Sequence, residues 1–346
     1  MDKNTLVGFA LIGAVIIGFG IYNRPSQEEM ERAQHYQDSI QNVMQKQEEP
    51  HKQQEAAAAK MQTVRLDSTS QFFQASQGRE QFTVLENNLL QVTFTNKGGR
   101  VCKAMLKEYN DQKKQPLVLF DQKDGAMNIG FDGKTENLIS GNMYFQATNV
   151  TDSTVTMRAN AANGGYLDFT YRLLPDSYVL DFTVQATGLQ NFFPSSAKSM
   201  NIDWSQRARQ MEKGYTFEQR YTSLTYKPVN DSFDYLSETK DEKETVPEAL
   251  EWIAFKNQYF SCVFIAENNF EKVTLESKMD QKGSGYMKRY QADMTTSFDP
   301  SGAKPSRFQF YFGPNHYKTL LATNKLTFDN KDPELEDLVY LGWPII

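Results

Sequence analysis

The sequence predicts a mainly β protein: a large antiparallel sandwich, preceded by one membrane-spanning helix and followed by short helices. Apolar and polar residues alternate with a period of two between about residues 72 and 312, as they do in half-buried strands. Clusters of glycine, proline, asparagine and aspartate interrupt this alternation, and helical periodicity is nearly absent before residue 315. Many short strands without intervening helices indicate an antiparallel sandwich.

Residues 5–22, TLVGFALIGAVIIGFGIY, form an uncharged apolar run. As a helix of about 1.5 Å per residue it would cover roughly 27 Å, close to the hydrocarbon thickness of a bilayer. A cleaved signal peptide is the alternative, but its apolar region is typically about 7 to 15 residues and ends at a small-x-small site. We therefore expect residues 1–22 to be an uncleaved transmembrane anchor. Lys3 and Arg24 nearly balance across the run, so charge alone leaves its orientation open.

Residues 23–70 are rich in glutamine, glutamate and lysine and cannot form a packed core. Their apolar positions make only a thin helical stripe, which Pro50 interrupts. We expect a mobile or partly helical tether, with a partner-binding coiled coil as the alternative. The sandwich domain would follow at residues 71–330.

Several segments carry the strand pattern most clearly. Residues 90–95 precede a turn at residues 96–99, and residues 167–173 and 178–184 flank a turn at residues 175–177. Further strands are predicted at residues 252–265, 273–276, 286–294 and 307–312.

Helical spacing is found only near the end of the sequence. Tyr317, Leu320 and Leu321 recur at helical intervals within residues 315–324, and a second stretch begins at Pro333 with Leu335, Leu338 and Val339 on one face. Residues 331–346 would begin a helical approach to a membrane. Because the sequence stops on the apolar residues 341–346, we expect it to be a fragment of a longer protein.

Composition and motifs argue against several functions. The net charge of -6 disfavours nucleic acid as a partner, because phosphate binding requires a basic surface. His35 and His51 lie in the tether, and His316 is expected to be a surface or helix-start residue. We predict no catalytic, cofactor or metal site, and no enzyme. The glycine pairs at 98–99, 164–165 and 283–285 indicate hairpin turns, and the charged residues 231–248 indicate a solvated loop.

Cysteines and aromatic residues each leave an alternative open. Cys102 and Cys262 lie in apolar, strand-like contexts, which favours two buried thiols over a disulfide. Six aromatic residues could line a ligand groove, although core packing is the favoured interpretation; they are Trp204, Tyr215, Phe217, Tyr221, Tyr226 and Trp252.

Together these segments resemble the YidC-type bacterial membrane protein insertases, in particular their Bacteroidetes-like members. Residues 1–26 resemble the family's first transmembrane segment, and VLENNLLQVTFTNKGGRVCKAMLKEY resembles its opening strand pair. EWIAFKNQYFSCVFIA resembles the family's WVA-x-x-x-QYF strand, here with Trp252, Gln258 and Phe260. FYFGPNHYKTLLATNKL and LEDLVYLGW resemble the end of its large periplasmic domain.

This resemblance implies a periplasmic β-supersandwich of galactose-mutarotase-like shape, anchored in the inner membrane with its N-terminus in the cytoplasm. It implies a protein that assists insertion and folding of membrane proteins, alone or with the Sec translocon. Its partners would be Sec accessory subunits, nascent membrane proteins, and the lipid bilayer through residues 5–22. The insertase groove would lie on five further helices outside these residues. A membrane-tethered carbohydrate-binding or mutarotase-like protein is the alternative.

Overall fold

A computed structural model of the chain describes residues 66–329 and 331–339. The chain divides into two units, Met1–Val64 and Arg65–Ile346, and all described elements belong to the second. The predicted anchor at residues 5–22 and most of the predicted tether therefore lie outside the described residues. Within residues 66–329 and 331–339, no helix is both long and apolar enough to span a membrane.

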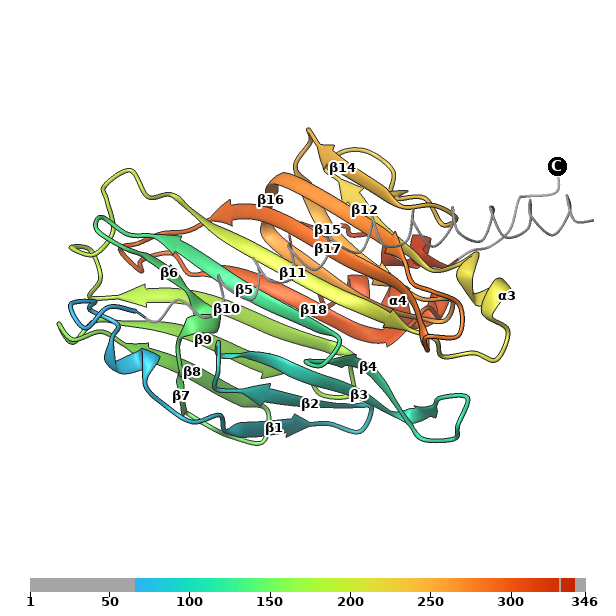
Figure 1. Cartoon of the computed structure of the whole chain (residues 1–346), viewed down its shortest axis with the longest axis horizontal. Coiled ribbons are helices and arrows are strands. Elements are labelled where there is room, and N and C mark those ends of the chain that lie inside the picture. Colours follow the sequence, from blue (N-terminus) through green and yellow to red (C-terminus); the bar gives the residue numbers. More distant parts are fainter. Residues whose placement is uncertain (1–65, 330, 340–346) are drawn as a thin grey trace, which may run out of the picture. The chain divides into compact units, whose positions relative to one another are not determined.

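Two antiparallel sheets build this unit (Figure 1). The smaller has the order β1-β2-β3-β4; its strands are β1 (Phe82–Glu86), β2 (Leu90–Thr95), β3 (Arg100–Asn110) and β4 (Pro116–Asp121). The larger sheet contains the other fourteen described strands. The prediction of a mainly β, antiparallel protein is confirmed.

The larger sheet consists of two arms that share the long strand β16 (Phe260–Met279). Strands that pair around the second half of β16 form the first arm: β5 (Gly125–Asp132), β6 (Asn137–Ile139), β11 (Ser199–Arg209), β14 (Glu242–Val246) and β17 (Tyr286–Ser297). Strands that pair around its first half form the second arm: β7 (Gln146–Thr148), β8 (Thr154–Asn160), β9 (Tyr166–Leu173), β10 (Val179–Thr187), β12 (Ser223–Pro228), β13 (Asp234–Tyr235), β15 (Leu250–Lys256) and β18 (Ser306–Pro314).

Strand β16 can belong to both arms because its backbone is irregular between them. Asn269 and Lys272 have positive φ angles of 62° and 48°, and the pairing with β17 shifts register between Glu271 and Thr274. Such irregularities bend a strand and increase its twist. The two arms consequently face each other across one core.

Aromatic side chains fill the space between the arms. Trp204 of β11 stacks on Phe255 of β15 with ring centroids 3.8 Å apart, and its edge meets Phe264 and Phe310 of the second arm. Trp204 and Trp252 are 2% and 0% exposed. Both belong to the core, as the sequence analysis favoured, and do not form a ligand platform.

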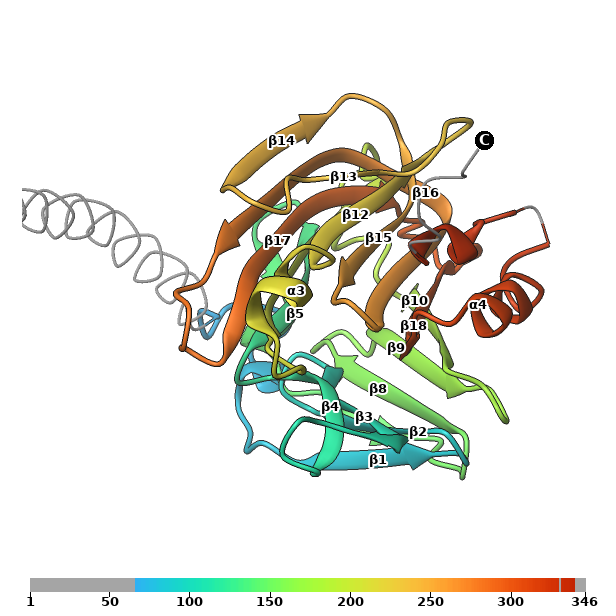
Figure 2. The same cartoon turned by 90° about the vertical axis from the view of Figure 1, so that its right-hand side faces the viewer.

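The smaller sheet packs against both arms (Figure 2). The rings of Phe94 (β2) and Tyr171 (β9) have centroids 4.7 Å apart, and the Tyr171 hydroxyl donates to the Gly99 carbonyl at 2.9 Å. On the other arm, Gln206 of β11 donates to the Leu119 carbonyl of β4 at 2.9 Å. Gly98 and Gly99 turn the chain between β2 and β3 with φ angles of 83° and 62°, which glycine adopts without strain.

Helices are short and lie at the ends of strands. The single-turn 3-10 helices are η1 (Gln74–Ser76), η2 (Ser140–Asn142) and η3 (Leu335–Leu338), and the α-helices are α3 (Tyr215–Gln219) and α4 (Tyr317–Asn324). Helix α4 confirms the helix predicted at residues 315–324, with His316 at its N-cap. The second predicted helix is a 3-10 turn that begins at Leu335, because Glu334 has a left-handed backbone. Only Leu335 and Leu338 of its predicted apolar face are fully buried.

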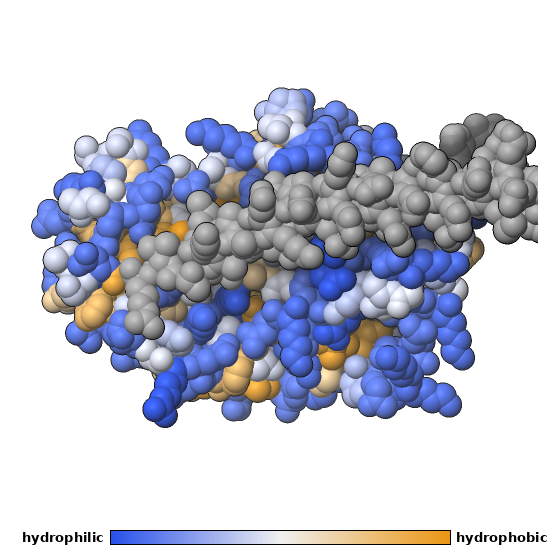
Figure 3. Space-filling view, in the orientation of Figure 1, coloured by the Kyte–Doolittle hydropathy of each residue, from blue (hydrophilic) through white to orange (hydrophobic). Residues whose placement is uncertain are grey.

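Two other predictions were wrong in detail. Residues 252–265 form two strands, β15 and β16, because residues 257–259 turn the chain back. Residues 231–248 are not only a solvated loop, since β13 and β14 form within them and β14 pairs with β16. The face shown in Figure 3 is mainly hydrophilic, with hydrophobic residues in separate patches.

The cysteines are free and buried, as predicted. Burial raises the pKa of the Cys102 thiol to about 12, and burial also raises the pKa of Cys262. Thiols that stay protonated react slowly.

Two carboxylates face each other on the outer side of the first arm. Asp203 of β11 pairs in register with Asp293 of β17, and the Gln291 side-chain amide donates to both, at 2.9 and 2.8 Å. Burial and, to a lesser extent, the Asp293 charge raise the pKa of Asp203 to about 6.

Stability is expected to depend on this carboxylate pair. The folded protein binds the Asp203 proton more tightly than the unfolded chain, so stability should fall as the pH rises from about 4 to about 7. Asp203→Asn should remove this dependence and raise the free energy of unfolding at pH 7.5 by about 1–2 kcal/mol. Urea unfolding between pH 4 and 8 measures it, with the exposed Asp152→Asn as control. An unchanged pH profile in Asp203→Asn would contradict the assignment.

Candidate functional site

The segment that follows α4 is held against the second arm by several specific contacts. We call residues 331–339, with the residues that bind them, the C-terminal junction. In the sequence it is a polar stretch with two well-spaced leucines, and in the structure Leu335 and Leu338 are 0% and 1% exposed. Those two side chains insert it into the core of the sandwich.

A buried indole fixes the start of the junction. Trp252 of β15 donates from Nε1 to the Pro333 carbonyl at 2.7 Å. Proline has no amide hydrogen and leaves residue 333 only a carbonyl to pair. The indole thereby satisfies a buried acceptor while its rings remain in the core.

Two buried lysines link the junction to the sandwich through charge; one lies on β12 and the other in the junction itself. Lys227 of β12 has a side chain only 8% exposed, and its Nζ donates to Glu334 Oε2 at 2.6 Å and to the Asp231 carbonyl at 2.5 Å. Lys331 is similarly buried; its Nζ lies 3.6 Å from Glu251 Oε1 and also bonds to Asn269. Removing one member of such a pair leaves a buried charge without compensation.

Helix α4 contributes the remaining contacts. Asn324 accepts from the Leu335 amide at 3.1 Å and donates to Glu336 Oε2 at 2.5 Å. Burial and the neighbouring carboxylates of Glu334 and Glu336 raise the pKa of Asp337. The junction therefore connects α4, β12, β15 and β16 to whatever follows residue 339.

A groove of about 580 Å³ lies beside the junction on the outer face of the second arm. Four of its charged side chains pair with each other, Arg172 with Asp181 at 2.6 Å and Arg307 with Glu267, and the exposed Asp329 also lines it. Gln309, 4% exposed, donates to Asp181, while its Oε1 has no partner. Such a surface suits a polar ligand better than an apolar one.

Among the described residues, neither the junction nor the lining of the groove contains a histidine or a cysteine. His316 lies exposed at the start of α4, where its Nδ1 meets Thr319 Oγ1 at 2.9 Å. Among residues 66–329 and 331–339, no three histidine, cysteine or carboxylate side chains cluster as metal ligands. Of the six aromatic residues considered for a platform, Trp204, Tyr226 and Trp252 are buried, Tyr215 and Tyr221 are half-buried, and Phe217 is exposed.

Sequence reasoning named Trp252, Leu335 and Leu338 but missed the charged residues of the junction. Lys227 lies in β12, SLTYKP, all six of whose residues are buried, but its serine, threonine and proline give no sequence signal of that burial. Lysine in such a position is normally paired. Its partner Glu334 lies 107 residues away, and only the fold brings the two together.

Comparison with known proteins gives a consistent family. The family described as the YidC periplasmic domain matches residues 83–346. A membrane protein insertase YidC from Phocaeicola vulgatus is 64% identical over the whole chain, and one from Bacteroides fragilis is 50% identical. The chain spans about 56% of the length of each.

Solved structures with a similar fold are distant in sequence. A galactose mutarotase related enzyme from Lactobacillus acidophilus is 10% identical, with a TM-score of 0.42, over 67% of this chain and 97% of its own. A galactose mutarotase-like protein from Lactobacillus casei is 11% identical, with a TM-score of 0.43, over 67% of this chain and all of its own.

Proposed function

The chain belongs to the YidC periplasmic domain family, and we propose that it is the anchored periplasmic part of an inner-membrane insertase. The observation that carries this proposal is the match along the entire chain to proteins named membrane protein insertase YidC. Because the chain spans only about 56% of those relatives, we assign insertion itself to the remaining part of the protein.

In this proposal each predicted segment has a mechanical role. Residues 1–22 anchor the chain with the N-terminus in the cytoplasm, residues 23–70 are the tether, and residues 71–330 form the periplasmic sandwich. Residues 331–346 lead back to the membrane. The junction supports this arrangement, since Trp252, Lys227 and Lys331 attach the returning segment to the sandwich.

Insertion requires no covalent chemistry, so the proposed role is non-enzymatic. The cost to be lowered is that of moving polar segments through hydrocarbon, where unsatisfied polar groups are expensive. We propose that the sandwich holds partners near the site of insertion: nascent membrane proteins, and the Sec translocon with its accessory subunits. Crosslinking scanned over the sandwich surface would test the Sec contact, and capture of no Sec component would contradict it.

The function is testable in a bacterium whose own insertase can be depleted. The complete gene, read beyond codon 346, should encode five further hydrophobic segments and restore insertion of a single-span client, measured by protease protection. Residues 1–346 alone should not restore it. Failure of the complete protein would contradict the insertase assignment, and rescue by residues 1–346 would contradict our placement of the insertion step.

Carbohydrate binding is a second candidate, and the polar groove beside the junction is the observation that favours it. Arg172, Asp181 and Gln309 present both donors and acceptors there. Titration calorimetry of the full chain in detergent against mono- and disaccharides distinguishes the two proposals. We expect no saturable binding, because both arginines of the groove already pair with its carboxylates.

A further inference from the structure

One end of the sandwich combines exposed aromatic side chains with basic loops. We define this basic end as the loop at residues 111–115, helix α3 with its flanks at 213–221, and the turns at 257–259 and 281–285. The start of α4, residues 316–322, completes it. Figure 2 views this end of the domain, with α3 and α4 turned toward the reader.

Large apolar side chains are exposed across this end. Phe217 of α3 is 54% exposed, Tyr259 in the turn between β15 and β16 is 51% exposed, and Tyr317 and Leu321 of α4 are 42% and 41% exposed. Of the three apolar residues at helical spacing, Tyr317, Leu320 and Leu321, only Leu320 is buried. Exposed apolar groups gathered in one region indicate an interaction surface.

The exposed charged residues within these ranges are all cationic: Lys113, Lys114, Lys213, Arg220, Lys282 and Lys318. The exposed carboxylate of Asp241 borders them, where it accepts from the Met279 amide at 2.7 Å. The two carboxylates within the ranges are not presented to solvent in the same way. Asp111 accepts from the amides of Lys113 and Gln115 in its own turn, and Glu218 is 0% exposed. The chain as a whole carries a net charge of -6, so this local positive charge is distinctive.

Direct contacts join these elements. Gln112 donates from its amide to the Met211 carbonyl at 3.2 Å, and Gln210 donates to the Gly285 carbonyl at 2.9 Å. The Asn315 amide donates to the Tyr259 carbonyl at 2.6 Å, which places the start of α4 against that turn.

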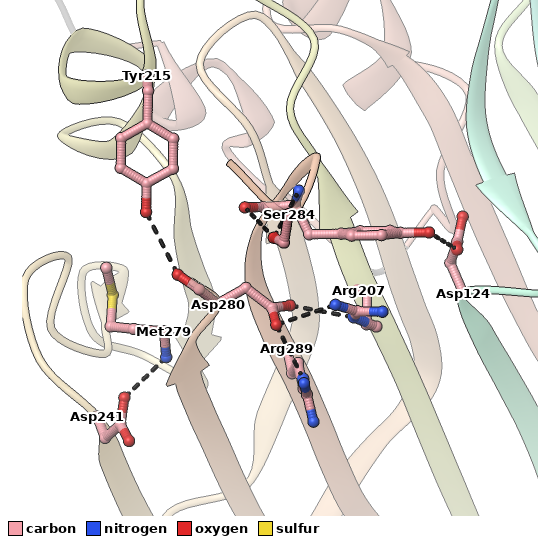
Figure 4. A network of polar contacts seen from close by, with 9 residues as sticks. Asp124, Arg207, Tyr215, Asp241, Met279, Asp280, Ser284 and Arg289 are labelled. Atoms are coloured by element: carbon pink, nitrogen blue, oxygen red, sulfur yellow. Dashed lines mark hydrogen bonds and ion pairs between the residues drawn. The ribbon is translucent and has the colours of Figure 1, made fainter. Parts of the chain in front are cut away.

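A polar network holds α3 in place (Figure 4). Tyr215, the first residue of α3, donates to the Asp280 carbonyl at 3.4 Å. The Asp280 carboxylate, 4% exposed, pairs with Arg207 at 3.0 Å and with Arg289 at 3.1 Å. Glu218 accepts from the amides of Met211 and Glu212 at 2.9 and 3.1 Å. These contacts fix the backbone of α3, so the exposed Phe217 ring projects from a helix that is held in place.

From these observations we propose that the basic end docks on an anionic lipid surface, with Phe217, Tyr259 and Tyr317 at the headgroup level. Tyrosine rings, which carry a polar hydroxyl, are favoured at that depth, an exposed phenylalanine adds apolar surface, and lysine and arginine are attracted to anionic lipid. The described chain ends at Val339 in the segment bound to α4, and the sequence continues YLGWPII, which contains a further interfacial residue type in Trp343. This continuity and the positive charge favour lipid over a protein partner.

The N-terminal anchor is compatible with this orientation. The described chain, which starts at Leu66, begins with the blue segment at the end of the domain opposite α3 (Figure 1). At roughly 3.3 Å per extended residue, the chain between residues 22 and 66 can reach roughly 140 Å. The anchor therefore does not force the Leu66 end of the domain onto the bilayer.

Docking can be measured on the full chain in vesicles. A cysteine at exposed Thr216, beside Phe217, would carry an environment-sensitive fluorophore, and a cysteine at exposed Ser196 at the opposite end would be the control. Cys102 and Cys262 are buried and should not label. With phosphatidylglycerol in the bilayer, we expect brominated lipids to quench the fluorophore at 216 and not that at 196. In phosphatidylcholine alone, quenching at 216 should be lost.

Charge variants identify the cause. Lys213→Gln with Arg220→Gln should lower the ratio of docked to undocked domains about tenfold or more, whereas Lys134→Gln with Lys198→Gln, exposed at the opposite end, should not change it. Phe217→Ser should lower it several-fold. Equal exposure of the fluorophores at 216 and 196 in anionic vesicles would overturn the proposal. Burial of the fluorophore at 216 that occurs only after a protein partner is added would overturn it as well. This inference rests on the proposed membrane placement; the fluorophore reports docking and client protection reports insertion, so the two can fail separately.

Discussion

Trp252→Ala is expected to lower the free energy of unfolding by about 3–5 kcal/mol and to release the C-terminal junction. The side chain is 0% exposed, so its removal leaves a large cavity beside β12 and β16. It also removes the indole donor to the Pro333 carbonyl. Both losses act on the segment that connects the sandwich to the rest of the proposed insertase.

Two measurements separate packing from the hydrogen bond. Urea unfolding followed by the β-sheet circular dichroism signal gives the overall loss, and hydrogen exchange of the Leu335 amide, which bonds to Asn324, reports the junction. Trp252→Phe keeps most of the ring packing but removes the indole N–H donor, so it should lower the free energy of unfolding by about 1–3 kcal/mol. A junction amide as protected in Trp252→Ala as in the unaltered protein would contradict this role.

Trp204→Ala should destabilise the protein by a similar amount, about 3–5 kcal/mol, without acting on the junction directly. Trp204 stacks on Phe255 across the two arms and contacts Phe264 and Phe310, so its loss opens the centre of the core. At low urea, the Leu335 amide should exchange through global unfolding only. Phe217→Ala, on an exposed ring, should change stability by less than about 0.5 kcal/mol.

These two tryptophan variants serve as controls for each other. If Trp252 acts only as a core residue, the Leu335 amide should exchange at the same rate in both variants when they are compared at equal overall stability. If the bond to Pro333 matters locally, exchange should be faster in Trp252→Ala at equal overall stability. A destabilisation of less than about 1 kcal/mol in Trp204→Ala would contradict the central position of that side chain.

The sequence by itself determined most of the local structure. Alternation of Leu167, Phe169 and Tyr171 predicted a strand with a buried face, because side chains in a strand point to opposite sides in turn. Hairpin turns at the glycine pairs, the helix after Pro314 and the burial of both cysteines followed from equally local signals. Ordered motifs across the chain also indicated the family that the comparisons show.

Only the tertiary structure decided how distant segments meet. Periodicity at residues 315–324 predicted a helix, but it did not decide that Leu320 is buried while Tyr317 and Leu321 are exposed, since the buried face depends on where the neighbouring turn lies. Similarly, no spacing rule joins Lys227 to Glu334 or Trp252 to Pro333. Pattern rules describe neighbours along the chain, whereas burial and charge pairing depend on contacts across it, and both the junction and the basic end consist of such contacts.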